Sequence, residues 1–124
     1  MSTLKVNAIQ NIGGTDLLAP LQSGSAKAWI NFNGTTVTSN TDMTGVRDSF
    51  NVSSLVDVGI GHYTVNFSTA FSNTNYCYTV GGDGVSGGSR TVTDVTQNTN
   101  SFNFDTRGLF QFDPSTVCVA FFGD

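Results

Sequence analysis

The sequence carries little charge and contains no glutamate. Charged residues make up 11% of the chain, and all nine acidic residues are aspartates. The five basic residues are scattered along the chain, and the formal net charge is −4. Nucleic-acid binding needs basic side chains gathered on one face, where they neutralise phosphates. We therefore expect no nucleic-acid partner.

Long apolar runs are also missing. No stretch approaches the roughly 20 apolar residues that cross a bilayer as a helix. The first residues do not show a basic segment followed by an apolar one, which is the pattern of a secretory signal. We expect neither membrane insertion nor export through a signal peptide.

Cysteine and histidine are scarce, which bears on disulfides and on metal binding. Cys77 and Cys118 are too few for a disulfide framework and lie in strand-like runs, so we expect buried free thiols. A single disulfide between them is the alternative. His62, the only histidine, is expected to be an exposed turn residue. These three residues make no metal-ligand cluster, and we expect neither a metal nor a cofactor.

A catalytic site is hard to build from these residues. A nucleophile needs a base and an orienting group, and no such motif surrounds the histidine. Glycoside hydrolysis needs two carboxylates, which here must both be aspartates. Asp48, Asp94 and Asp105 lie in or beside expected strands, and no motif marks any two of them as a pair. Asp48 is expected to form an ion pair with Arg47 that sets strand register. We expect no enzymatic activity.

The residues that are present favour short strands joined by polar turns. Glycine is abundant, and serine, threonine and asparagine fill much of the remainder. The stretch Arg47–Ser68 holds two strand-like runs joined by a glycine-bearing turn, and it predicts a central β-hairpin. In the first run Phe50 and Val52 alternate with polar residues. In the second run one face holds Tyr63, Val65 and Phe67.

The remaining runs complete an all-β fold. Ser101–Thr106 places two phenylalanines on one face, with Asn103 and Asp105 on the outward face. Thr116–Phe122 is apolar on both faces, which indicates a central strand of a sandwich or a strand at a subunit contact. About eight short strands without an amphipathic helix predict an antiparallel β-sandwich, jelly-roll-like in character.

Two regions follow from this pattern: an N-terminal arm over residues 1–24 and a β-sandwich domain over residues 25–124. The arm reads as a short β-hairpin, and an isolated hairpin cannot bury its own apolar side chains. Copies of the arm that meet around an axis would bury them; packing on the arm's own domain is the alternative. The apolar arm residues expected to lie at such a contact are Leu4, Val6, Ile9, Ile12, Leu17 and Leu18.

Binding residues are expected in polar loops. Thr35–Gly45 and Gly81–Arg90 are the two candidate loops, because loops carry most differences in binding. An exposed indole can stack on a sugar ring, although a tryptophan more often lies in a core or a subunit contact. The candidate receptor contacts are Trp29, Asp42, Asp83 and Arg90.

Four strings in the first part of the chain form an ordered set: STLKVNAIQNIGGTDLL (Ser2–Leu18), KAWINFNG (Lys27–Gly34), VRDSFNVSS (Val46–Ser54) and YTVNF (Tyr63–Phe67). The set resembles a family of phage tail-fibre and virion structural proteins, especially from phages of cyanobacteria and marine bacteria. The resemblance covers most of residues 2–75 and fades after Tyr76. Two departures are a longer Thr35–Gly45 segment and His62 where an acidic or polar residue is more common. Loop-borne specificity is therefore expected to differ.

The resemblance implies a protein of the virion, made in the host cytoplasm and exposed on the particle. It implies a small homotrimeric tail fibre for host attachment. Its expected partners are further copies of itself, other virion proteins of the tail, baseplate or capsid, and a host-surface glycan. A capsid decoration or cement protein is the alternative, and a glycan-cleaving enzyme is the third hypothesis.

Overall fold

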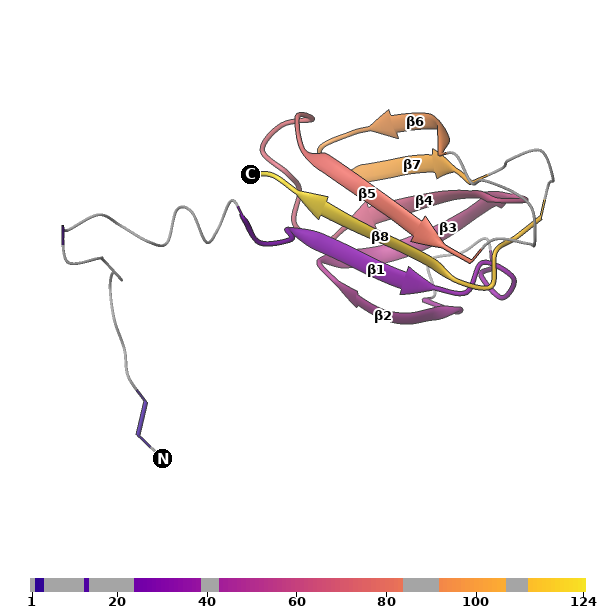
Figure 1. Ribbon diagram of the computed structural model, residues 1–124, viewed down its shortest axis with the longest axis horizontal. Coiled ribbons are helices and arrows are strands. Elements are labelled where there is room, and N and C mark those ends of the chain that lie inside the picture. Colours follow the sequence, from indigo (N-terminus) through magenta and orange to yellow (C-terminus); the bar gives the residue numbers. More distant parts are fainter. Residues whose placement is uncertain (1, 4–12, 14–23, 39–42, 84–91, 107–111) are drawn as a thin grey trace.

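The computed structural model describes residues 2–3, 13, 24–38, 43–83, 92–106 and 112–124. These residues form two four-stranded sheets, all of whose neighbouring strands are antiparallel. The sheets face each other (Figure 1), and the expected β-sandwich is confirmed. The jelly-roll character stays a prediction.

Eight strands make up the two sheets in the described part of the chain. The first sheet has, in spatial order, β2 (Val46–Phe50), β1 (Ala28–Phe32), β8 (Val117–Phe122) and β5 (Cys77–Gly82). The second has β3 (Val52–Gly59), β4 (His62–Phe67), β7 (Ser101–Asp105) and β6 (Thr93–Gln97). The apolar run at the end of the chain is thus a central strand, flanked by β1 and β5.

The core lies between the sheets and is rich in aromatic rings. T-shaped contacts join the sheets, as where the ring of Phe121 lies 5.0 Å from those of Phe67 and Phe102. Burial of one such ring stabilises the fold by about 1.5–3 kcal/mol. The predicted alternation is observed in β1 and β4, whose inner faces bury Ala28, Ile30, Phe32, Tyr63, Val65 and Phe67.

The predicted central hairpin is observed as β3 and β4, but its first run is split between two sheets. Asn51 has a φ of 56° and ends β2, so that the chain passes directly into β3 of the other sheet. The Asn51 side chain holds this corner, donating to the carbonyls of Lys27 and Thr69 at 3.1 and 3.0 Å. The period-two pattern breaks at the corner, and Phe50 is 54% exposed.

The structure corrects the expectation for the two cysteines, which are exposed rather than buried. Both lie on the outer face of the first sheet, because the residues that alternate with them, such as Val117 and Val119, point into the core. Cys118 of β8 lies opposite Gly81, four residues along β5 from Cys77. This offset separates the two by about 13 Å along the strand, beyond the reach of a disulfide. The alternative of a bond between them within one chain is therefore wrong.

Asp105 was expected to point outward into solvent; its place opposite His62 keeps it on the outer face, but it is not exposed. Its side chain is fully buried at the end of β7, where it lies opposite both His62 and Thr93. The reason is tertiary: the strands β4 and β6 cover it from both sides. The neighbouring Asn103 is half-buried on the outer face, in line with the alternation.

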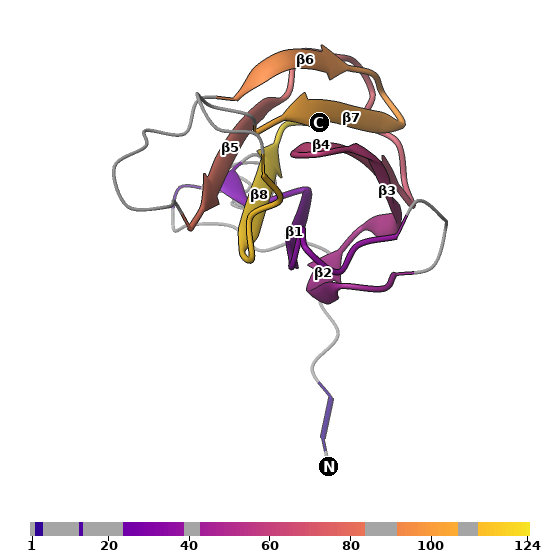
Figure 2. The same ribbon diagram turned by 90° about the vertical axis from the view of Figure 1, so that its right-hand side faces the viewer.

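The strands give the sandwich two different ends. The chain enters β1 beside Lys27 and leaves β8 towards Asp124 at one end, which we call the arm end. The opposite end holds the β1–β2, β3–β4, β5–β6 and β7–β8 connections, and we call it the loop end. Figure 2 views the molecule from this loop end. All six predicted contact residues of the arm lie outside the described residues, within 4–12 and 14–23.

Gly34 at the loop end tests how tightly the connections pack. A Cβ at Gly34 would lie 2.7 Å from the carbonyl oxygen of Pro114 and would collide with the Tyr63 hydroxyl. We expect Gly34→Ala to lower the free energy of unfolding by about 1–3 kcal/mol. Gly59, at the same end, has nothing within 4 Å of such a Cβ. Gly59→Ala should therefore stay within about 0.5 kcal/mol of wild type in urea unfolding; equal losses would contradict the packing described.

Candidate functional site at the loop end

The β1–β2 connection is held to the rest of the loop end by backbone hydrogen bonds. Gly34 donates its N–H to the carbonyl of Pro114 at 2.8 Å, and Asn33 donates to Gly45 at 2.8 Å. The Asn33 side-chain oxygen accepts from the amide and the hydroxyl of Thr35 at 3.0 and 2.8 Å. The start of the predicted loop Thr35–Gly45 is thus anchored.

Arg47 of β2 joins the end of β1 to the β7–β8 connection. Its guanidinium donates to the carbonyl of Phe32 and the side-chain oxygen of Asn31, both at 3.2 Å, and to the carbonyl of Ser115 at 2.7 Å. Arg47 and Asp48 do not form the expected ion pair that would set strand register, because adjacent strand residues point to opposite faces. The Asp48 carboxylate instead accepts from the amide of Ser49 at 2.9 Å.

Asp83 fixes the start of the β5–β6 connection. Its carboxylate accepts from the Ser115 hydroxyl and, at 2.7 Å, from the amide of Thr116. Its own amide donates to the Thr116 carbonyl at 3.1 Å. The carboxylate was predicted as a receptor contact, and the structure shows it engaged with the β7–β8 connection.

Asp113 links the core to the loop end. One oxygen of its carboxylate accepts from the amide of Gly61 at 2.7 Å and from the hydroxyl of the fully buried Tyr63 at 3.0 Å. The nearby Asp57 accepts from the amide of Gly59 at 3.0 Å. Burial raises the pKa of Asp57, the negative charge of Asp113 raises it further, and the Gly59 bond opposes both.

A row of three hydrogen-bonded polar side chains crosses the outer face of the second sheet next to this site. The His62 Nε2 lies 2.7 Å from the side-chain oxygen of Asn103, whose amide group donates to the Thr64 hydroxyl at 2.7 Å. Because that amide nitrogen is the donor to Thr64, the oxygen accepts from a protonated Nε2. His62 is half-buried in β4, which corrects its expected place in an exposed turn. Its ring contacts Asn103 of the neighbouring strand β7, and the sequence alone does not show that β4 and β7 pair.

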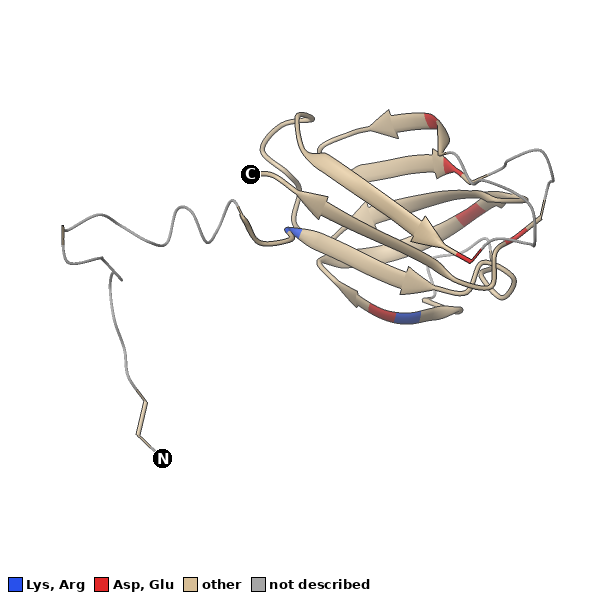
Figure 3. Ribbon diagram, viewed as in Figure 1, with Lys and Arg blue, Asp and Glu red and all other residues tan. Residues whose placement is uncertain are grey.

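The loop end therefore carries several carboxylates on a hydrogen-bonded frame. Figure 3 shows that acidic positions lie towards this end of the sandwich. Among the described residues, no group of three histidine, cysteine or acidic side chains could hold a metal ion. No helix in the described ranges has the length and apolarity of a membrane span.

The two predicted contact residues that the structure describes, Trp29 and Asp83, do not lie together. Trp29 is half-buried on the outer face of the first sheet, opposite Phe50 and Ala120 in the neighbouring strands. Asp83 lies at the loop end, and Asp42 and Arg90 fall outside the described residues. The sequence analysis did not identify Arg47 or Asp113 as residues of this site. The sequence signal for Asp113 is its place before a proline and after an aromatic run, since an Asp-Pro pair favours a turn.

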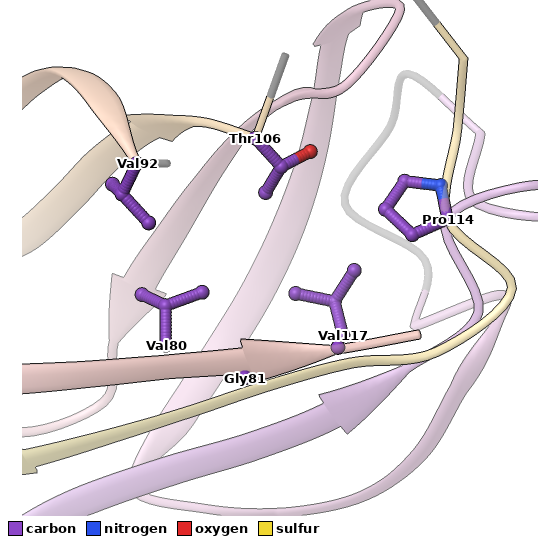
Figure 4. Close-up of a pocket in the computed structure, with 7 residues that line it drawn as sticks. Val80, Gly81, Val92, Thr106, Pro114 and Val117 are labelled. Atoms are coloured by element: carbon purple, nitrogen blue, oxygen red, sulfur yellow. The ribbon is translucent and has the colours of Figure 1, made fainter. Parts of the chain in front are cut away.

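A small apolar cavity opens between the sheets beside β5. Its volume is about 40 Å³, and the side chains around it point inward (Figure 4). A sugar ring does not fit such a space. The lining residues are Val80, Gly81, Gly82, Val92, Thr106, Pro114 and Val117.

The raised pKa of Asp57 predicts a pH-dependent stability. The folded state holds this proton more tightly than the unfolded chain, so stability falls as the pH rises through and above the ordinary value of 3.8. We expect Asp57→Asn, which keeps an acceptor for Gly59, to raise the melting temperature near pH 7. The gain should vanish at about pH 3, where the carboxyl is protonated in both states.

The matched control is Asp113→Asn, which keeps an acceptor for Tyr63 and removes the second charge. The gain from Asp57→Asn should be smaller in that background, because part of it comes from relief of the Asp57–Asp113 repulsion. A gain that is the same at both pH values would contradict the assigned cause.

Comparisons with family models, with curated proteins and with solved structures find no match for this chain. No family is therefore shown by relatives. The proposed function depends on the residues and contacts of this chain, together with the resemblance of its short strings.

Proposed function

We propose that this chain is a phage virion structural protein, a small homotrimeric tail fibre that attaches the particle to the host surface. The observation that carries the proposal is the separation of the two ends of the sandwich. The N-terminal arm joins the domain at the arm end, beside Lys27. The two candidate binding connections, β1–β2 and β5–β6, start at the opposite end, where they would face a host cell if the arm is held by the particle.

The loop end suits adhesion because its connections are tied to one another. Arg47 and Asp83 bond to the β7–β8 connection, and Asp113 of that connection bonds to Gly61 of the β3–β4 connection, so the described parts of these connections are held together before a ligand arrives. Preorganisation lowers the entropic cost of binding. Hydroxyl and amide groups on such a frame bind glycans weakly, and three copies per fibre raise the effective concentration.

Three of the four strings that carry the family resemblance lie largely in the strands, which supports separate roles for the scaffold and the loop end. KAWINFNG contains β1, VRDSFNVSS contains β2 and the start of β3, and YTVNF lies within β4. They build the scaffold rather than the loops. A shared scaffold with a divergent loop end is what a family of adhesins with different hosts would require.

A capsid decoration or cement protein is the second candidate, and one surface favours it. The outer face of the first sheet carries Phe50, which is 54% exposed, beside the half-buried Trp29. Exposed aromatic side chains of this kind are typical of contact surfaces. In this reading the arm clamps neighbouring shell subunits and the outer face rests on them. We propose no catalytic activity for either role.

The oligomer is tested by the solution mass of the full chain. Light scattering should give three times 13.1 kDa. Leu4→Asp with Val6→Asp should dissociate the trimer, because charges on the apolar face of the arm cannot be buried without a partner. The sandwich should keep its melting transition. The control Lys5→Asp with Asn7→Asp alters the other face and should remain trimeric; dissociation of both would mean that the arm's apolar face is not the determinant.

Adhesion is tested on an array of bacterial surface saccharides. The acidic loop end predicts retention on neutral or amino sugars and little on sialylated ones, because like charges repel. Deleting Val85–Gly88 should reduce retention while the melting temperature changes little, since closure entropy depends weakly on loop length. Thr74→Ala at the arm end is the control. If wild type binds no saccharide while labelling the capsid of particles, the decoration role is the correct one.

A further inference from the structure

Three of the four edge strands are protected against pairing with another chain. In β2, Arg47 and Asp48 are charged, and its register with β1 is interrupted. In β3, Asp57 is charged and the register with β4 shifts twice. In β6, Asp94 has a φ of 49° beside a register shift. Charges and bulges at sheet edges are devices that prevent strand addition.

The fourth edge, β5, has none of these devices. Its sequence Cys77–Gly82 contains no charge and no proline, and its six residues pair with β8 in an unbroken register. All of them are exposed or half-exposed among the described residues. A flat, uncharged edge strand accepts a further strand through its backbone N–H and C=O groups.

The core beneath β5 is also incompletely covered in the described part of the chain. Tyr78, on the inner face of β5, is 36% exposed, although its ring lies 4.6 Å from that of Phe102. Val80 and Val92 are only partly buried and line the small apolar cavity of Figure 4. On the opposite side of the sandwich, the Asn51 corner joins the two sheets directly. Apolar surface is thus left at the side where β5 is the edge.

The N-terminal arm has the sequence of a strand that fits this edge. In Thr3–Ile9, three apolar residues alternate with polar ones, and the segment holds one charge. If the segment pairs with β5, Leu4, Val6 and Ala8 can face the same side as Val80 and cover the partly exposed core. The polar residues between them then face outward, as strand alternation requires.

We propose that the Thr3–Ile9 segment of one copy adds as a strand to the β5 edge of the neighbouring copy. This inference rests on the proposed arm-mediated trimer and names the surface that receives the arm. The occupant is a neighbouring copy, because pairing within one chain would fill the β5 edge and leave the proposed trimer without an arm contact. Each copy gives a strand to the next, and such a head-to-tail contact closes into a ring of three when neighbouring copies are related by a rotation of about 120°.

Disulfide trapping in the full chain tests this contact, because Cys77 lies in β5 and Cys118 in the next strand inward. Lys5→Cys and Asn7→Cys place a thiol on the outward face of the arm, one at a time to allow for register. After oxidation, non-reducing gels should show covalent dimers and trimers in at least one variant. Their yield should fall about tenfold when Cys77→Ser is added, because a disulfide needs closely placed cysteines. Cys118→Ser is the matched control and should leave the yield unchanged.

Each other outcome overturns the proposal in a distinct way. Crosslinks confined to single chains, seen by mass spectrometry, would show that the arm folds onto its own β5. Crosslinks that depend on Cys118 would place the arm across the sheet face. A trimeric mass by light scattering without Cys77-dependent crosslinks would overturn this contact and leave the proposed trimer intact. A monomeric mass would overturn the trimer, and the strand exchange with it.

Discussion

The buried Tyr63 side chain is the interaction on which the architecture of the loop end depends. Its ring lies in the core, 4.9 Å from Phe32 of the other sheet. Its hydroxyl donates to Asp113, which also accepts from the amide of Gly61. A buried hydroxyl needs a partner, and a buried ring fixes where that partner must be. Gly34 completes the arrangement, because any side chain there would displace the tyrosine. The core thereby positions the connections.

The same arrangement separates structural from binding roles among the polar residues. Arg47 and Asp83 form hydrogen bonds with backbone groups of the β7–β8 connection, so both charges hold that connection in place. In the proposed adhesin, the hydroxyl and amide groups of the connections would make the contacts with the host. A weak adhesin needs this combination, because a rigid frame limits the entropy lost when several weak contacts form together.

The proposed adhesion and the proposed strand exchange use opposite features of one scaffold. The loop end is polar and tied together by side-chain hydrogen bonds. The β5 edge is uncharged and regular and has partly exposed apolar residues beneath it. A fibre protein needs both kinds of surface, since one holds the copies together and the other meets the host. The Asn51 corner closes the sandwich on the side away from β5, so the β5 edge is on the open side.

Period-two alternation in the sequence was enough to predict the strands, the hairpin of β3 and β4, and the inward faces of β1 and β4, because side-chain direction in a strand follows from local geometry. Alternation does not say which strands pair or what covers a face. Tertiary pairing therefore decided that the cysteines are exposed and offset, that Asp105 is buried, and that Phe50 and Val52 belong to different sheets. It also decided the partners of Arg47 and Asp113, since those contacts join residues far apart in the chain, which only the packed sheets bring within hydrogen-bond distance.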